Sequence, residues 1–385
     1  MKTIAVVTAT RAEYGLLSPV IRELRKYEDD ELRTELIVTG THLSEDYGMT
    51  VGEISDRIDH RIPISVLSEK ETDISKNQAE ALVKFTELFA DKNYDAVILL
   101  GDRYETLAVA IAAGNTRTPV FHLCGGDTTE GAIDEWIRHS ITKIAYLHFV
   151  TNEESRRRVI QLGEDPSRVF NYGSTGIDNI FKCSDMNKKE ALDSVGLPEC
   201  RYALCTYHPV TMDGGDVEGQ ISELLEAIKM FPNLEFIITK SNADLAGARI
   251  NELLDDAGKN IANVHVFASL GVRRYLSLMK YAEFVIGNSS SGIMETPAFH
   301  IPTINIGNRQ RGRLSAESII DCGNKCTDIT EAIRHSMSDE HRMICAQVKS
   351  PYGSGDSAGK IAAKIHEVIM IGGIDLKKQF YDVNI

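Results

Sequence analysis

Residues 285–305 read VIGNSSSGIMETPAFHIPTIN, and this stretch decides how the second half of the chain folds. A run typical of a buried strand, residues 282–286, stops at Gly287, and four polar residues precede a short segment with helical apolar spacing. A second strand-like run, residues 302–306, follows at once. The stretch therefore predicts strand, tight turn, helix N-terminus and strand. Pro297 lacks a backbone N–H, so we expect the helix to be short or kinked.

The turn in this stretch has the composition of an anion site. Ser289, Ser290 and Ser291 bring hydroxyls and free backbone N–H groups to the positive end of the helix dipole. Glu295 lies four residues after Ser291, hence on the same helix face, and its carboxylate suits a ribose diol beside a diphosphate. An ordinary capped helix is the alternative, because serine is a common N-cap. The two interpretations stand at even odds on this stretch alone.

Composition and charge exclude several classes of protein. A chain of 385 residues is long for one core, so two domains are expected. The net charge of −14 argues against a nucleic-acid partner, although a small anionic ligand can still bind where arginines cluster. No apolar stretch reaches the roughly 18 residues of a membrane span, so no membrane partner is expected.

The cysteines give no sign of a metal site or of disulfides. There are seven, an odd number, and they are scattered. Cys322 and Cys326 are the closest pair, and no second pair completes a zinc site. We therefore expect a thiol-reduced, cytoplasmic chain without a bound metal.

Strand-like and helical segments alternate through both halves of the chain. The predicted strands comprise residues 3–7, 36–38, 95–100, 119–123, 146–150 and 169–173, then 202–207, 234–239, 264–267, 282–286 and 302–306. The pattern predicts an α/β protein with two facing, doubly wound, Rossmann-like domains, residues 1–178 and 195–355, followed by a helical segment, residues 356–385. No GxGxxG follows a strand, so dinucleotide redox chemistry has no support in the sequence.

Polar residues follow the predicted strands of the first half. Arg11 comes after the first strand, Asp102 and Arg103 follow the strand at 95–100, and Asp127 follows the strand at 119–123. The carboxyl ends of parallel strands meet at one sheet edge, where ligands bind. Asp134 opens the next helix, so three acids can converge as acid/base chemistry requires. The alternatives are a loop arginine in solvent, a helix N-cap at Asp102 and a solvated acidic turn at Glu130 and Glu135.

Two further strand-end features concern possible ligands. His42 is undecided between a ligand and a loop filler, and His208 follows the strand at 202–207. Arg309, Arg311 and Arg313 form a local cationic patch in an acidic protein, for which a solvated turn is the alternative. A cleft between the two domains could hold a nucleotide sugar, with base and phosphates on one wall and sugar chemistry on the other.

Several short motifs together resemble the hydrolysing UDP-N-acetylglucosamine 2-epimerases of sialic-acid-type sugar biosynthesis. The resemblance runs nearly end to end, and the motifs are specific as a set. They are Arg11-Ala12-Glu13-Tyr14-Gly15, Gly101-Asp102-Arg103, Gly125-Gly126, Ile137-Arg138-His139, Tyr207-His208-Pro209-Val210-Thr211, Ser241-Asn242-Ala243-Asp244 and Gly287-Asn288-Ser289-Ser290-Ser291-Gly292.

The resemblance implies a fold, an activity and a partner. The fold is that of glycosyltransferase B with the active site in the interdomain cleft, and the last helix returns to the first domain. The activity is conversion of UDP-N-acetylglucosamine and water to N-acetylmannosamine and UDP. The assembly is a homodimer or homotetramer, without metal or cofactor.

The resemblance also implies roles for single residues. The UDP- and substrate-binding set comprises Arg11, Arg103, Arg138, Ser289, Ser290, Ser291, Glu295 and Arg309. The catalytic set comprises Asp102, Asp127 and Asp134 around the sugar and His208 at the leaving diphosphate. The chain departs from the family at Asp127, where Glu is common, and at Cys124, where Glu or His is common.

Three alternative functions stay open. One is 2-epimerisation of UDP-2,4-diacetamido-2,4,6-trideoxy-glucose (UDP-N,N'-diacetylbacillosamine), toward which Asp127 and Cys124 point by leaving a roomier, less polar wall. The other two are a glycosyltransferase on the same fold and a nucleotide-sugar sensor without turnover. The acids at Asp102, Asp127 and Asp134 favour elimination over transfer, because transfer does not involve the hydrogen at C2.

Overall fold

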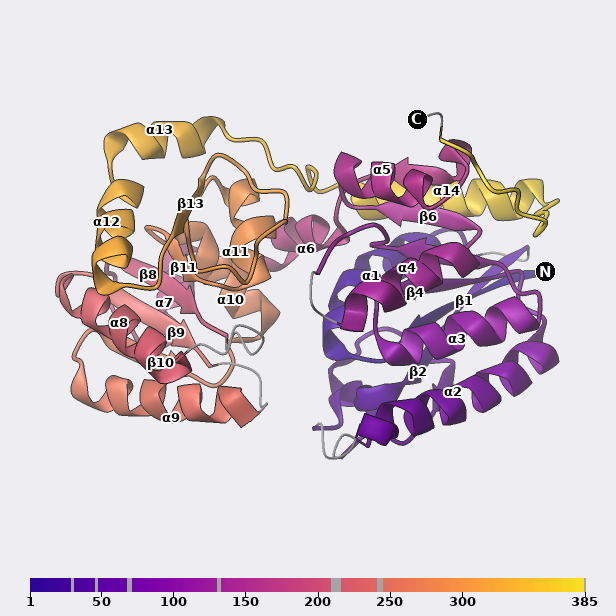
Figure 1. Ribbon diagram of the computed structural model, residues 1–385, viewed down its shortest axis with the longest axis horizontal. Coiled ribbons are helices and arrows are strands. Elements are labelled where there is room, and N and C mark those ends of the chain that lie inside the picture. Colours follow the sequence, from indigo (N-terminus) through magenta and orange to yellow (C-terminus); the bar gives the residue numbers. More distant parts are fainter. Residues whose placement is uncertain are drawn as a thin grey trace. The chain divides into compact units, whose positions relative to one another are not determined.

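A computed structural model gives the structure of residues 1–28, 31–45, 48–67, 71–129, 133–208, 216–240 and 245–383. The chain forms two compact units, which we call the first domain (Met1–Asn179 with Tyr352–Ile385) and the second domain (Ile180–Pro351) (Figure 1). Within the described ranges, every helix is too short or too polar to cross a membrane.

The first domain is built on a parallel sheet of seven strands among its described residues, in the order β3-β2-β1-β4-β5-β6-β7. The strands are β1 Lys2–Thr8, β2 Leu32–Thr39, β3 His60–Ile62, β4 Ala96–Leu100, β5 Val120–Leu123, β6 Leu147–Val150 and β7 Val169–Asn171. The helices are α1 Arg11–Arg25, α2 Glu71–Lys92, α3 Tyr104–Asn115, α4 Ile133–Ile144, α5 Glu153–Gln161, α6 Thr175–Cys183, which runs into the second domain, and α14 Ser357–Ile371. Short 3-10 helices are η1 Gly40–Leu43, η2 Thr50–Glu53 and η3 Pro166–Arg168.

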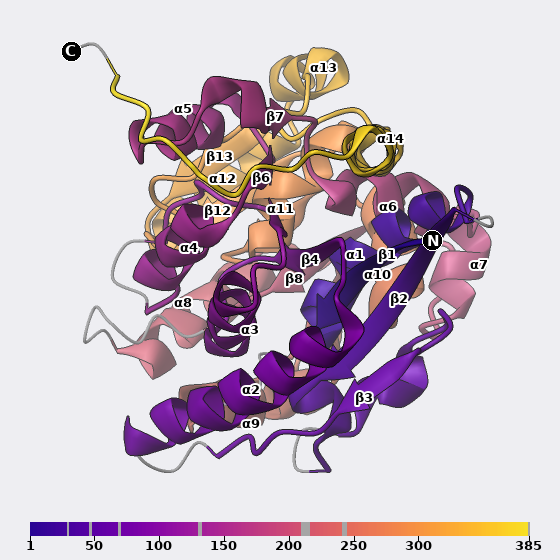
Figure 2. The same cartoon turned by 90° about the vertical axis from the view of Figure 1, so that its right-hand side faces the viewer.

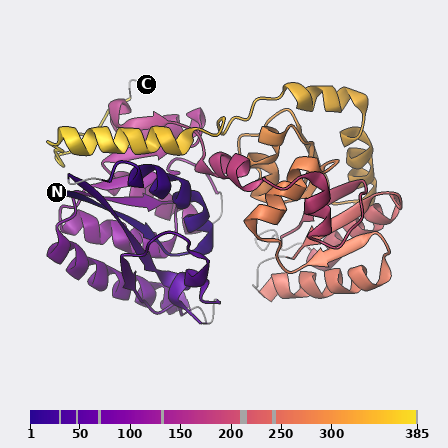
Figure 3. The same cartoon turned by 180° about the vertical axis from the view of Figure 1, so that it is seen from behind.

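Side chains of β1 alternate between two cores. Ile4 and Val6 pack with α1 and α14 on one face of the sheet, whereas Ala5 and Val7 pack with α2, α3 and α4 on the other. Both faces are therefore buried, as expected of a doubly wound sheet. Figure 2 shows α2 and α3 side by side, and Figure 3 shows α14 along the first domain.

The second domain repeats this topology. Its sheet has six parallel strands among the described residues, in the order β10-β9-β8-β11-β12-β13. The strands are β8 Tyr202–Thr206, β9 Glu235–Thr239, β10 Val264–Phe267, β11 Val285–Gly287, β12 Thr303–Ile306 and β13 Ile319–Cys322. The helices are α7 Lys188–Asp193, α8 Val217–Lys229, α9 Leu245–Asn260, α10 Gly271–Tyr281, α11 Ser290–Met294, η4 Thr296–Phe299, α12 Cys326–Ser336 and α13 Asp339–Gln347.

Each sheet contains a point at which the strand order reverses. In the first domain it lies between β1 and β4, and in the second between β8 and β11. Connections from the two strands leave for opposite faces at such a point, so a crevice opens at their carboxyl ends. The chain segments that follow these four strands are the first places to look for a site.

The structure confirms the predicted α/β class and the strand, turn, helix and strand of residues 285–305. The helix is short, as Pro297 predicted, because α11 ends at Met294 and Pro297 lies in the 3-10 helix that follows. Two edge strands, β3 and β13, were not predicted, since both are short and only partly buried. Between the two sheets, α6 ends at Cys183 and Asn187 begins α7 with a capping box to Glu190.

Candidate functional site

Arg11, Asp102 and Arg103 lie beside the switch point of the first domain. Arg11 is the first residue of α1, directly after β1, and its exposed guanidinium pairs with Glu53 at 2.9 Å. Asp102 and Arg103 stand between β4 and α3, where Arg103 is the N-cap of the helix. The prediction that these residues share one edge of the sheet is confirmed, because β1 and β4 are parallel neighbours.

Arg138 of α4 holds the acids of this edge in place. Its guanidinium is only 3 % exposed; one nitrogen pairs with the Asp102 carboxylate, and another donates to the Asp127 carbonyl at 2.8 Å. It also pairs with Glu135 at 3.2 Å. We expected Arg138 among the substrate-binding residues, but its guanidinium is enclosed by protein acceptors. Burial leaves this guanidinium little surface for a ligand.

The three aspartates differ in their surroundings. Asp127 accepts hydrogen bonds from Thr151 and Ser155, so its carboxylate is held toward the start of α5. Burial and the neighbouring charge of Asp102 raise the pKa of Asp134. Asp102 and Asp134 thus act on each other electrostatically, while the Asp127 carboxylate is bound to hydroxyls.

The loop after β5 explains the unusual residues near Asp127. Cys124 has a left-handed backbone, φ 63°, and burial raises the pKa of its thiol far above the usual range, so the group stays neutral. A Cβ on Gly126, φ 83°, would lie 2.2 Å from the Ser155 carbonyl, so only glycine fits there. These restraints fix where the main chain of Asp127 can lie.

Sequence reasoning missed two buried glutamates beneath this edge. Glu13 caps the start of α1 by accepting from the Ala9 and Thr10 amides at 2.7 and 3.0 Å, and burial raises its pKa to about 7. Glu105, fully buried, holds Arg103 through two hydrogen bonds of 3.1 Å. The capping-box spacing from Thr10 to Glu13 was a signal that could have found the first of them.

His42 is a structural residue. It is buried, and its ring nitrogens bond to Thr8 at 3.2 Å and Thr50 at 2.9 Å. Burial lowers its pKa to about 4, so the ring is neutral near pH 7. Of the two interpretations left open by the sequence, the loop filler is correct.

The serine-rich turn stands at the switch point of the second domain. Gly287 ends β11 with φ 137°, and a Cβ there would lie 2.0 Å from the Thr206 carbonyl of β8. Ser289 is the N-cap of α11 and accepts from the Ser291 amide at 3.4 Å. Ser290 is the first residue of α11, so its amide lies at the open N-terminal end of the helix. Tyr275 of α10 lies 2.6 Å from the Ser291 hydroxyl and fixes its direction.

Asn288 connects the ends of the two central strands, and sequence reasoning gave it no role of its own. Its fully buried side chain bonds twice to the main chain of His208, accepting at 2.7 Å and donating at 2.8 Å. Its carbonyl accepts from Arg309 at 2.9 Å and Gln310 at 2.8 Å. His208, Arg309 and the serine turn are therefore held in one frame, as the sequence predicted for a shared edge.

Glu295 follows α11 as its C-cap, with its amide 2.9 Å from the Ser291 carbonyl. Burial raises the pKa of its side chain to about 7, so protonated and ionised forms are both accessible near neutral pH. Such a carboxyl can donate to or accept from a ligand hydroxyl.

Some predicted motif residues lie outside the described residues. They are Glu130, the Pro209-Val210-Thr211 part of one motif and the whole Ser241-Asn242-Ala243-Asp244 motif.

The chain has the glycosyltransferase-B fold, in which two Rossmann-like domains each bring polar residues to the switch point of their sheet. This fold defines the class of protein. Solved structures support this class. The chain is similar to S. aureus MnaA in a structure with UDP, with a TM-score of 0.78 at 18% identity over 100% of both chains. It is also similar to UDP-GlcNAc 2-epimerase from Neisseria meningitidis bound to UDP-GlcNAc, with a TM-score of 0.75 at 20% identity over 96% of this chain and 100% of that one.

The chain belongs to the UDP-N-acetylglucosamine 2-epimerase family, whose model matches residues 23–366. It is 41% identical to the GDP/UDP-N,N'-diacetylbacillosamine 2-epimerase (hydrolyzing) of Campylobacter jejuni, over 89% of each chain. It is 37% identical to polysialic acid biosynthesis protein P7 of Escherichia coli, over 100% of this chain and 98% of that protein. It is 33% identical to the UDP-N,N'-diacetylbacillosamine 2-epimerase (hydrolyzing) of Legionella pneumophila, over 88% and 89%.

Proposed function

We propose that the chain is a hydrolysing 2-epimerase that converts UDP-N,N'-diacetylbacillosamine and water to UDP and the free 2-epimer, a 2,4-diacetamido-2,4,6-trideoxy-mannose. The observation that carries the choice of sugar is that relatives at 41% and 33% identity have this activity in their names. The sequence alone placed UDP-N-acetylglucosamine first and this sugar second, so the relatives reverse that order.

The chemistry explains why the site needs both an anion-binding part and carboxylates. The hydrogen at C2 of the sugar is not next to a carbonyl, so its direct removal is very slow. Loss of UDP from C1 builds positive charge at the anomeric carbon and makes this hydrogen removable. N–H donors and cations at the diphosphate therefore assist the first step, and a carboxylate near C2 assists the second.

In this proposal the switch point of the second domain binds UDP. The amides and hydroxyls of Ser289, Ser290 and Ser291 bind the diphosphate, together with Arg309, and Glu295 binds the ribose hydroxyls. His208 donates a proton or hydrogen bond to the leaving diphosphate. Arg11 and Arg103 of the first domain add positive charge for the phosphates.

The acids of the first domain act on the sugar. Asp102 forms an ion pair with Arg138, which requires the ionised form of its carboxylate, so we assign it as the base that takes the C2 proton. The C1–O bond breaks, UDP leaves with the electron pair, and C1=C2 forms. Asp134 holds its proton to higher pH than an ordinary aspartate because its pKa is raised. It then protonates C2 from the opposite face while water adds its hydroxyl to C1. The remaining proton of the water passes to the Asp134 carboxylate, and the proton held by Asp102 leaves to solvent.

Asp127 has a supporting role in this assignment. Its carboxylate bonds to Thr151 and Ser155, and its carbonyl accepts from Arg138. It therefore orients the arginine that holds Asp102. Glu at this position would be longer by one methylene and would need a different arrangement of these hydroxyls.

UDP-N-acetylglucosamine is the second candidate substrate, because the matching family model has that description. The two sugars differ at C4 and C6, where one carries hydroxyls and the other an acetamido group and a methyl. A pocket that hydrogen-bonds a hydroxyl strongly rejects an analogue without it, since its buried partners are left unpaired. The preference between the sugars is therefore expected to be large in one direction.

The test offers each UDP-sugar to the enzyme without an acceptor and identifies the released sugar by NMR. The proposal expects UDP and the free 2-epimer, with kcat/KM at least about tenfold higher for the diacetamido substrate. A tenfold preference for UDP-N-acetylglucosamine would overturn the choice of sugar. No UDP release without an acceptor, but release with one, would favour a glycosyltransferase, and binding without turnover would favour a sensor.

A further inference from the structure

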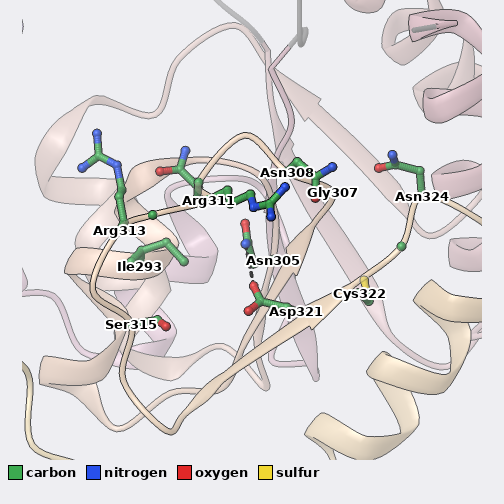
Figure 4. A pocket seen from close by; sticks show the side chains of 13 residues that line it. Ile293, Asn305, Gly307, Asn308, Arg311, Arg313, Ser315, Asp321, Cys322 and Asn324 are labelled. Atoms are coloured by element: carbon green, nitrogen blue, oxygen red, sulfur yellow. Dashed lines mark hydrogen bonds between the residues drawn. The ribbon is translucent and has the colours of Figure 1, made fainter. Parts of the chain in front are cut away.

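The second domain contains a cavity that no part of the proposed reaction uses. It has a volume of about 530 Å³ and lies between the segment after β12 and the end of β13 (Figure 4). Arg309 and Gln310 of this segment both donate to the Asn288 carbonyl, which fixes the segment against the serine turn. Arg311 and Arg313, and not Arg309, line the cavity. The cavity wall includes Ile293 of α11 but none of the residues assigned to UDP.

Three side-chain amides of the cavity wall each have an oxygen that accepts no hydrogen bond from the described residues. Asn305 is 5 % exposed; its amide nitrogen donates to Asp321 at 2.7 Å, and its oxygen has no partner in the described part of the chain. Figure 4 shows this oxygen on the side of the amide away from Asp321. Gln310, 6 % exposed, and Asn324 each leave an oxygen without a partner as well.

Such oxygens are rare in native proteins, because a buried acceptor without a donor costs about 1–3 kcal/mol. Three of them around one cavity indicate donors that the described residues do not supply. Each oxygen has almost no exposed surface in this conformation, so a hydroxyl group of a ligand would reach it after a small side-chain rotation. The Asp321 carboxylate, with only one oxygen bonded to Asn305, is a further acceptor for a hydroxyl.

The cavity wall also contains two arginines that form no ion pair with Asp321, the acidic residue of this wall, in the described part of the chain. Within the described ranges, neither Arg311 nor Arg313 has an acidic side chain within ion-pair distance, and Arg313 has only a weak contact with the Met294 sulfur at 3.6 Å. Two guanidinium groups beside one cavity suit a phosphate, which they can bind through forked hydrogen bonds. Arg311 and Gly312 are exposed, so a ligand can enter from solvent.

We propose that this cavity binds a phosphorylated monosaccharide, with its phosphate on Arg311 and Arg313 and its hydroxyls on Asn305, Gln310, Asn324 and Asp321. The volume lies within the range of small-molecule sites, about 300–1,000 Å³. The inference does not depend on the proposed function, since none of these six residues takes part in the proposed reaction.

Calorimetry on the full chain tests the proposal, with glucose 6-phosphate as the probe and saturating UDP present. We expect binding that UDP does not abolish, with glucose alone and inorganic phosphate each at least about tenfold weaker, because each lacks half of the recognised groups. Arg311→Ala with Arg313→Ala should weaken binding by about tenfold or more, whereas Arg334→Ala, an exposed arginine of α12, should leave it unchanged.

Several results would overturn the proposal. They are the absence of binding at about 10 mM probe, loss of binding when UDP is added, equal binding of inorganic phosphate or of glucose, and binding that survives the double arginine variant. Asn305→Asp is a second variant, which nearly preserves side-chain shape but adds negative charge to the cavity wall. It should also weaken binding, and unchanged affinity would equally contradict the proposal.

Discussion

The two switch points have the same topology and opposite chemistry. In the first domain, charged side chains meet charged side chains: Arg138 pairs with Asp102 and Glu135, and Arg103 with Glu105. In the second domain, the segments after β8 and β11 are held by one neutral residue, Asn288, and present serine hydroxyls and amides. The same topology therefore carries prearranged charges in the first domain and neutral hydrogen-bond donors in the second.

The difference shows what each edge can do. Ion pairs that exist before a ligand arrives hold carboxylates in a fixed direction, which suits proton transfer to or from one carbon atom. The Ser290 amide, at the open N-terminal end of α11, remains available to an anion. Variants of the first edge should therefore change kcat, and variants of the second edge should change UDP affinity.

The largest effect is expected for Asp102→Asn. The amide cannot accept the C2 proton, so kcat should fall by about 10²- to 10⁴-fold, while UDP affinity should stay within about threefold. Steady-state kinetics and calorimetry with UDP measure the two quantities. Glu53→Gln, which removes an exposed partner of Arg11, is the control and should change kcat little. Loss of UDP binding in Asp102→Asn would refute the separation of roles.

His208→Ala should have the second-largest effect. Asn288 holds the main chain of His208, so removing the imidazole leaves the segment in place and removes only the proposed donor to the leaving group. We expect kcat to fall by about tenfold or more, equivalent to about 1.4 kcal/mol of barrier. Activity within about threefold of the parent enzyme would make His208 a structural residue.

Ser290→Ala should mainly weaken nucleotide binding. One lost hydrogen bond to a charged phosphate corresponds to about 1.5–3 kcal/mol, so the Kd for UDP should rise by at least about tenfold. Once substrate is saturating, kcat should change less than for either variant above. Thr327→Ala, an exposed hydroxyl on α12, is a matched control. Unchanged UDP affinity in Ser290→Ala would contradict a diphosphate site at this turn.

The smallest effect is expected for Glu295→Gln, in how its melting temperature depends on pH. Burial raises its pKa from 4.5 to about 7, so the folded chain holds this proton at pH values where the unfolded chain has lost it. Its contribution to stability is therefore present below pH 4.5 and is lost as pH rises through about 7. Glu295→Gln cannot ionise, so its melting temperature relative to the parent should rise between about pH 4.5 and 7 and stay level above that range. A difference that does not change with pH would show that Glu295 is not buried in this way.

Sequence patterns predicted the architecture because both sheets are parallel and buried on both faces. Such strands appear as continuous apolar runs, and polar residues at their carboxyl ends mark the ligand-binding edge, as at Asp102 and Ser289. The pairing of side chains could not be predicted in this way. Asn288 appears as one polar residue among several, and only the structure shows that it connects His208 with Arg309.

Arg138 is a second residue whose side-chain contacts could not be predicted from the sequence. The resemblance implied a role for it at the site, but its burial depends on Asp102, which lies 36 residues away, and on the Asp127 carbonyl as well as on Glu135 of its own helix. Long-range packing of this kind leaves no local pattern. The edge strand β13, which is only partly buried, was missed for a related reason.

The most direct test of the account is turnover in heavy water. In the proposed reaction, a carboxylate of the first domain removes the C2 hydrogen, and a second group protonates C2 from the opposite face. The new hydrogen at C2 must therefore come from solvent. We predict one deuterium at C2 of the released sugar, read by NMR and mass spectrometry, in every molecule formed. Released sugar that keeps its original hydrogen at C2 would contradict elimination and show simple hydrolysis instead.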